Sequence, residues 1–182
     1  MAQNLTFGSN TPASLAKLAE AVVYVAHKTQ GDFGSIKINK TIYYADLEAF
    51  KTLGSSITGA QYHKIRLGPV PKHILMAERK LESEGALKVD RDTMNHSRIA
   101  GRAPNLNLFS ESETKILDTF IAELAPKSAM QVSEESHDIR WDVVRNQDLH
   151  TSSHFWTAQS LIKTQEMHSG CLRKWVGNNG RL

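Results

Sequence analysis

Four side chains towards the end of the sequence have the types and order of a zinc-binding set. His150 and His154 stand four positions apart, which would place both on one face of a helix, and His168 and Cys171 follow. Imidazole nitrogens and a thiolate are ligands that zinc binds tetrahedrally. Structural zinc sites usually contain more cysteine in tighter pairs, and Cys171 is the only cysteine in the chain. The sequence therefore favours no metal and no other cofactor, with this set as the weaker alternative.

A second group, Ser136, His137 and Asp138, has the residue types of a catalytic triad. Consecutive residues on a helix or strand point in different directions, so these three neighbours do not form a triad in space. The sequence also contains no glycine-rich phosphate loop, no Gly-x-Ser-x-Gly and no His-Glu-x-x-His. We therefore expect a protein that is not an enzyme.

A third group consists of four basic residues on a predicted β-hairpin: Lys88, Arg91, Arg98 and Arg102. A helix followed by a basic hairpin is the order found in winged helix-turn-helix proteins, in which such residues contact phosphates. Two aspartates between them reduce the local positive charge. A DNA-binding transcriptional regulator that uses the 86–104 hairpin is thus the alternative function.

Helical spacing and capping residues predict the elements that position these groups. Pro12 begins a helix that Gln30-Gly31-Asp32 ends, and Ser35 caps a second helix that ends at Gly54. Residues 57–67 form a short hairpin or an extended loop. The Gly68-Pro69-Val70-Pro71 stretch is predicted to be a rigid turn, because its prolines donate no backbone hydrogen bond, and Pro71 then opens a third helix that runs to about residue 84.

The second half of the sequence continues with a β-hairpin over residues 86–104 and a fourth helix that begins at a capping box of Ser110 and Glu113. Two further helices are predicted over residues 130–136 and 156–167, and the tail from Ser169 is expected to be loose. The fold class that follows is mainly α with small β-hairpins, a single-domain helical bundle.

The composition supports one soluble domain. The 182 residues include 40% hydrophobic and 23% charged side chains, and the formal net charge of +3 is too small to indicate nucleic-acid binding by itself. A single cysteine excludes an internal disulfide, which fits a reducing compartment. The first residues do not read as a secretory signal, and no apolar run approaches the roughly 20 residues of a membrane span. We expect a cytoplasmic protein without a membrane partner.

Four motifs occur in order along the sequence, and together they resemble one family. Residues 38–50, Ile-Asn-Lys-Thr-Ile-Tyr-Tyr-Ala-Asp-Leu-Glu-Ala-Phe, are similar to a K-L-N-K-L-L-Y-Y-A-D helix. Residues 56–62 are similar to an I-T-G-x-x-Y segment, residues 68–71 to a G-P-V-P turn and residues 136–141 to an S-H-x-x-x-W element. This series resembles the Panacea domain of the SocA-like antitoxins. The resemblance implies residues 1–11 as an N-terminal tail, 12–145 as the domain, and 146–182 as a divergent C-terminal extension, where the family's I-P-Y segment is absent.

The resemblance implies an antitoxin that neutralises a cognate toxin by direct protein–protein binding, in phage-associated and other toxin–antitoxin systems. Some relatives of this kind act instead as adaptors that deliver the toxin to a cellular protease. No active site is carried over from the family.

The residues that could contact such a partner are Tyr62, Gly68, Pro69, Val70, Pro71 and Trp141. A rigid turn loses little entropy on binding, and Tyr and Trp are common interface anchors. The alternative is that Trp141 is buried in the core and that the Gly-Pro segment only directs the chain.

Overall fold

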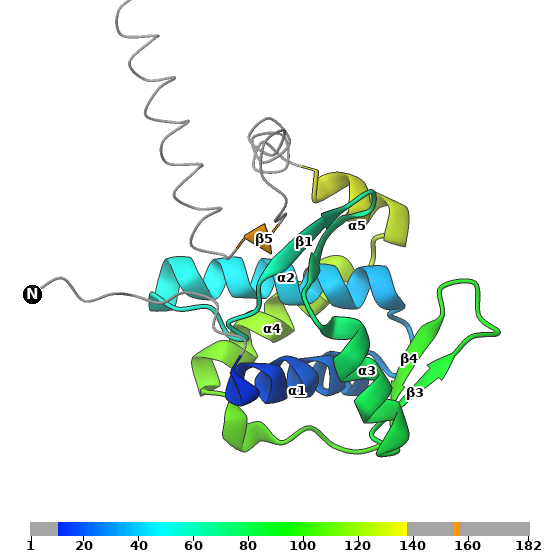
Figure 1. The fold of residues 1–182 in the computed structure, drawn as a ribbon. Helices are drawn as coiled ribbons and strands as arrows, with labels where there is room; N and C mark the ends of the chain where they lie inside the picture. Colours follow the sequence, from blue (N-terminus) through cyan, green and yellow to red (C-terminus); the bar gives the residue numbers. More distant parts are fainter. Residues whose placement is uncertain (1–10, 138–154, 157–182) are drawn as a thin grey trace, which may run out of the picture.

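The computed structural model describes residues 11–137 and 155–156 of the chain. The described helices are α1 (Pro12–Thr29), α2 (Ser35–Leu53), α3 (Ile74–Ser83), α4 (Glu111–Leu124), α5 (Ala129–Glu135) and the short 3-10 helix η1 (Leu106–Leu108). The described strands are β1 (Tyr62–Ile65), β2 (Gly68–Pro71), β3 (Leu87–Asp90), β4 (Ser97–Ala100) and β5 (Phe155–Trp156). The predicted class, mainly α with small hairpins, is confirmed (Figure 1).

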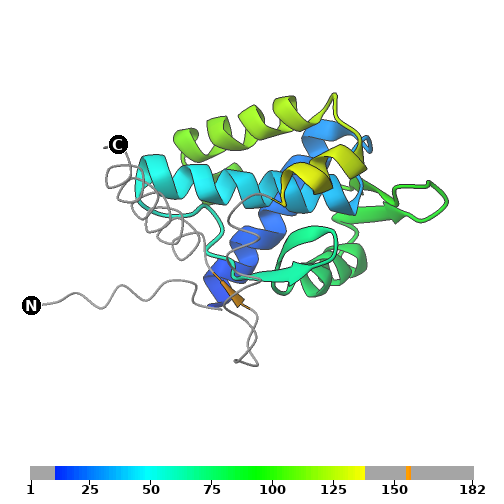
Figure 2. The same cartoon turned by 90° about the horizontal axis from the view of Figure 1, so that it is seen from above.

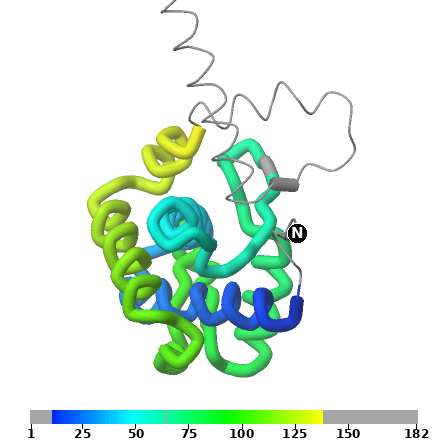
Figure 3. The backbone as a smooth tube through the Cα atoms, turned by 90° about the vertical axis from the view of Figure 1, so that its left-hand side faces the viewer, coloured from blue at the N-terminus to red at the C-terminus, as the bar shows by residue number. Residues whose placement is uncertain are grey.

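Helix α2 lies at the centre of the described residues. It contacts α1, α4, α5 and β2, and Figure 3 shows these elements around it in a view close to its axis. Apolar side chains at helical spacing on α2 are buried, with Ile38, Ile42, Ala45 and Ala49 each at most 1% exposed. These side chains belong to one hydrophobic cluster that also includes α1 and α4. Because α2 is packed on several sides, it also buries the polar side chains Asn39, Lys40, Thr41 and Asp46.

The ends of the first two helices follow local sequence rules. Thr11 caps α1 by accepting a hydrogen bond from the Ser14 backbone N–H at 3.2 Å, as expected before Pro12. Gln30 ends α1 in the left-handed conformation. The prediction that Ser35 caps α2 is wrong by one position, because Gly34 is the N-cap and Ser35 is the first helical residue.

The Gly68-Pro69-Val70-Pro71 segment is a strand, so the prediction of a rigid turn is wrong. It forms β2, which pairs antiparallel with β1 in the register Tyr62↔Pro71 to Ile65↔Gly68. Proline is compatible with a strand whose missing N–H faces away from its partner, and β2 lies at the edge of its sheet. Helix α3 consequently begins at Ile74 and not at Pro71.

The second half follows its prediction more closely. Strands β3 and β4 form the expected hairpin, which projects beyond the helices in Figures 1 and 2. The capping box of Ser110 and Glu113 is present at the start of α4, and α5 begins with a second box made by Ser128 and Gln131. A capping box needs only residues three positions apart, which is why the sequence predicts the first box; the second box was not predicted.

Strand β5 adds a third strand to the first sheet, whose order is β2-β1-β5. It pairs antiparallel with β1 through Tyr62↔Trp156 and His63↔Phe155. The sequence placed Trp156 at the start of a helix, and that residue is a strand residue instead. The rest of the predicted 156–167 helix lies outside the described residues.

Candidate functional site

A buried polar network joins the first two motifs. The Asp46 carboxylate on α2 is fully buried and accepts hydrogen bonds from the Thr58 backbone N–H at 2.8 Å and from the Tyr62 hydroxyl at 2.6 Å. The Thr58 hydroxyl donates to the same carboxylate. Burial raises the pKa of Asp46, against the lowering effect of these hydrogen bonds, and burial with the Asp46 charge raises the pKa of Tyr62. The network fastens the loop before β1 to the central helix.

A second buried group lies where β1 turns into β2. Lys40 is 1% exposed, and its Nζ donates to the Pro69 carbonyl at 2.8 Å. Burial lowers the pKa of Lys40 to about 7. Gly68 has a φ of +93°, and a Cβ there would lie 2.2 Å from Ser136 Oγ and 2.5 Å from Lys40 Nζ. Only glycine fits this position, because its backbone passes directly over both side chains.

The predicted partner-binding residues that the structure describes are buried or partly buried, which indicates a role in the fold. Tyr62 is completely buried, and Gly68, Pro69 and Pro71 are buried in β2, whereas Val70 is partly buried. Because a buried side chain offers little contact area to another protein, the alternative reading of this motif as a structural element is the better supported one. Trp141 lies outside the described residues, and partner binding through any of these positions stays a prediction.

Most of the basic residues proposed for DNA binding form ion pairs with carboxylate side chains. Arg98 is buried and forms two hydrogen bonds of 3.0 Å with Glu78, and Arg102 forms two with Glu20 at 2.7 and 2.8 Å. The hydrogen bond with Arg102 lowers the pKa of Glu20. Arg98 also donates to the His96 carbonyl.

At the outer end of the same hairpin, Arg91 pairs with Glu82 at 3.0 Å, and Lys88 is exposed. Paired guanidinium groups have little charge left for phosphates. Three of the four residues, Arg91, Arg98 and Arg102, thus have a carboxylate partner, which weakens the case for DNA binding, although that function stays a prediction.

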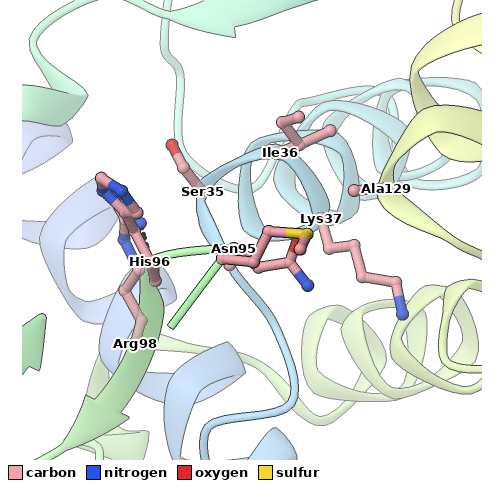
Figure 4. Close-up of a pocket in the computed structure, with 9 residues that line it drawn as sticks. Ser35, Ile36, Lys37, Asn95, His96, Arg98 and Ala129 are labelled. Carbon is pink, nitrogen blue, oxygen red and sulfur yellow. Dashed lines mark hydrogen bonds between the residues drawn. The ribbon is translucent and has the colours of Figure 1, made fainter. Parts of the chain in front are cut away.

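A pocket of about 290 Å³ lies where the hairpin loop meets the start of α2. Figure 4 shows Ser35 and Ile36 on the helix side, with Asn95 and His96 of the loop nearby. The two backbones approach closely, since a Cβ on Gly34 would lie 2.0 Å from the Asn95 carbonyl oxygen. Lys37 at the edge of the pocket donates to the Ala125 carbonyl at 3.0 Å. The close approach of Gly34 and Asn95 joins the hairpin loop to the start of α2, and the Lys37 contact joins α2 to the end of α4.

An apolar groove of about 440 Å³ lies between α1, α3 and η1. Leu15, Ala16, Ala19, Met76 and Leu108 contribute apolar lining, and Lys80, Glu84 and Arg102 are among the charged residues that also line it. Exposed apolar side chains lie in the same elements: Leu75, 63% exposed, Met76, 53%, and Leu106, 56%. Concave apolar surface of this kind is typical of binding sites.

Sequence reasoning missed this groove, although a signal was present. Ile74, Ala77 and Leu81 are spaced at i, i+3 and i+7 and form the buried stripe of α3. Leu75 and Met76 fall outside that stripe, so helical periodicity alone places two large apolar side chains on the surface.

The four residues of the zinc prediction, His150, His154, His168 and Cys171, lie outside the described residues. Within residues 11–137 and 155–156, no group of three or more His, Cys, Asp or Glu side chains is placed to hold a metal ion. In the same part of the chain, no helix is both long and apolar enough to cross a membrane.

Comparison with known proteins gives one match. The family model described as "Antitoxin SocA-like, Panacea domain" matches residues 38–142, which is more than half of the chain. No curated protein and no solved structure matches the chain. The matched residues include the Asp46 network, the Gly68 contact and both described hairpins.

Proposed function

We propose that this protein, which belongs to the SocA-like antitoxin family defined by the Panacea domain, neutralises a cognate toxin by direct contact in the cytoplasm. The observation that carries the proposal is the family match over residues 38–142, the region that contains the central helix and its buried networks. We propose further that the protein acts by binding and not by catalysis.

The motif residues contact one another inside the domain, and this supports a role in binding through the exposed surface. Asp46, Thr58 and Tyr62 satisfy one another inside the domain, and Gly68 packs against Lys40. Because these side chains make their contacts inside the domain, we propose that a partner binds the surface around them. The groove between α1, α3 and η1 is one part of that surface with exposed apolar side chains.

Co-expression with the adjacent open reading frame tests the proposal. We expect the neighbouring gene product to arrest growth when expressed alone and to be harmless when this protein is also expressed. Co-purification of the two proteins through a tag on either one should then demonstrate direct contact. A neighbour that is harmless alone, or a toxic neighbour that this protein does not neutralise, would count against the proposal.

Measuring the amount of toxin in the cell, with and without this protein, distinguishes two routes of neutralisation. Masking by contact leaves the amount of toxin unchanged when this protein is present. Delivery to a cellular protease lowers the amount of toxin, and deletion of that protease restores it. Our proposal is masking, so a protease-dependent loss of toxin would replace it with the adaptor function.

A further inference from the structure

The β1–β2 hairpin can accept a further strand on one side only, because the outer edge of β2 is closed. The Lys72 N–H donates to the Gln61 carbonyl at 2.6 Å, which makes Gln61 and Lys72 a hydrogen-bonded pair. Hydrogen-bonded and non-hydrogen-bonded pairs alternate along antiparallel strands, so the backbone groups of Pro69 and Pro71 face away from β1.

Those outward positions cannot accept another strand. Neither Pro69 nor Pro71 has an N–H to donate, and the Pro69 carbonyl already accepts from the buried Lys40. Prolines at an edge are a known protection against strand addition. A strand can therefore add to the β1–β2 hairpin only at the outer edge of β1.

The same alternation directs the backbone groups of Tyr62 and Lys64 away from β2 and towards the outer edge of β1. This edge accepts a strand, because β5 pairs with it through Tyr62↔Trp156 and His63↔Phe155. Within the described residues the pairing stops at His63. A two-residue strand has few hydrogen bonds to lose, so a longer segment can replace it.

Strand β5 comes from a part of the chain beyond the family match, which ends at residue 142. The matched region by itself supplies only β1 and β2 of this sheet. The family domain thus has one edge that is open to a further strand, and this chain fills that edge from its own C-terminal extension.

Positive side chains lie near both ends of β1, with Arg66 at the turn and Lys72 and His73 at the other end. Burial lowers the pKa of His63, and the charges of Lys72 and His73 lower it further. Ile65 is 46% exposed, and Arg66 in the adjoining turn is exposed as well. Basic side chains with an exposed apolar residue favour an extended segment that carries both acidic and apolar side chains.

We infer that the outer edge of β1 is a strand-addition site, which residues 155–156 occupy within the free protein and which an extended acidic segment of the toxin occupies in the complex. The inference rests on the proposed function for the identity of the partner. The strand exchange itself does not depend on it, and the experiment below tests the two separately.

A fluorescent peptide that copies residues 151–160 is the first probe, and the full-length protein is its target. Trp156→Pro removes the N–H that faces Tyr62 and should vacate the edge, so we expect this variant to bind the peptide at least about tenfold more tightly than the unsubstituted protein. Gly170→Pro, the matched control outside β5, should bind like the unsubstituted protein. Equal binding by the Trp156→Pro variant and the unsubstituted protein would overturn the inference.

A second substitution blocks the edge itself. Lys64→Pro removes an N–H that faces outwards and leaves the hydrogen bonds between β1 and β2 in place. The Trp156→Pro, Lys64→Pro double variant should therefore lose the gained peptide affinity while keeping its melting temperature within a few degrees. Retained affinity in a folded double variant would show that the peptide binds elsewhere and would refute the site.

A second peptide tests the preference for acidic segments. Continuing the register places Ser153 of the peptide opposite Ile65, next to the exposed Arg66 of the adjoining turn. A peptide with Ser153→Glu should bind the Trp156→Pro variant more tightly at low salt than at high salt. An acidic peptide that binds no more tightly at any ionic strength would contradict the proposed chemistry of the partner.

The toxin assay then separates the inference from the proposed function. If the unsubstituted protein binds the toxin and Lys64→Pro weakens that binding at least about tenfold, the edge is the toxin site. Full toxin binding by the Lys64→Pro variant would refute the inference and leave the proposed function standing. A purified protein that is dimeric, and monomeric after Trp156→Pro, would assign the edge to a second copy of the chain and refute the toxin as its occupant.

Discussion

Two regions of the domain bury charged side chains, and they neutralise them differently. Around α2, β1 and β2, the partners are neutral: Asp46 accepts from hydroxyl and backbone donors, and Lys40 donates to the Pro69 carbonyl. Around the β3–β4 hairpin the partners are charged, since Arg98 binds Glu78 in a pair whose side chains are 7% and 6% exposed. The first arrangement depends on precise backbone positions, whereas the second depends on two long side chains meeting.

The difference explains which residues form the recognisable motifs. A carboxylate satisfied by a backbone N–H and two hydroxyls needs Thr58 and Tyr62 at fixed distances along the chain, so that arrangement leaves a motif in the sequence. A charge pair between two elements can be replaced by apolar side chains of similar volume. The motifs therefore describe contacts that hold the fold together.

The largest effect is expected where a charged pair is broken. Arg98→Ala leaves the Glu78 carboxylate buried without its partner, which should reduce the free energy of unfolding by about 3–5 kcal/mol. Denaturant unfolding followed by circular dichroism measures this loss. The exposed pair of Arg91 and Glu82 is the control, and Arg91→Ala should leave the unfolding midpoint unchanged.

A double substitution sharpens the same comparison. Replacing both partners, as Glu78→Leu with Arg98→Met, removes the buried charges together and should recover most of the stability that Arg98→Ala loses. A double variant no more stable than the single variant would mean that the hairpin needs these ionic contacts specifically. The hairpin would then resemble the α2 region in its dependence on exact geometry.

The next effect concerns the backbone contact beneath β2. Gly68→Ala places a Cβ 2.2 Å from Ser136 Oγ in a left-handed conformation, and should cost about 2–4 kcal/mol of unfolding free energy. Gly54→Ala is the matched control, because its φ is +79° and nothing lies within 4 Å of the added Cβ. That variant should lose only about 1 kcal/mol from the backbone conformation. Equal losses for the two variants would show that the close contact at Gly68 contributes nothing.

The sequence predicted the features that depend on near neighbours along the chain. The start of α1 at Pro12, the stop at Gly54 and the capping box at Ser110 and Glu113 each need only a few adjacent residues. Helical periodicity likewise identifies the face of α2 that meets the core, through Ile38, Ile42, Ala45 and Ala49.

The features that the sequence did not predict depend on distant partners. The prolines at 69 and 71 indicated a turn, and β2 is a strand only because β1 pairs with one side while Lys40 satisfies the other. Arg98 read as a DNA contact because its partner Glu78 lies on a different element. For the candidate site, the motifs identified the family but not the strand-accepting edge of β1, which depends on register and on residues 155–156.

The smallest effect is one of pH, and it tests whether the neutral environment of Lys40 differs from that of a charge pair. Burial lowers the pKa of Lys40 from 10.5 to about 7, so between these values the unfolded chain binds the proton and the folded chain does not. Stability should therefore rise with pH, by about 2 kcal/mol between pH 7 and 9. Lys40→Met should remove this contribution, so the difference in unfolding free energy between the two proteins, measured by urea at several pH values, should change over this range. A constant difference would mean that Lys40 keeps its proton in the folded protein. The Pro69 carbonyl would then stabilise the buried Lys40 ammonium as effectively as the Glu78 carboxylate stabilises Arg98.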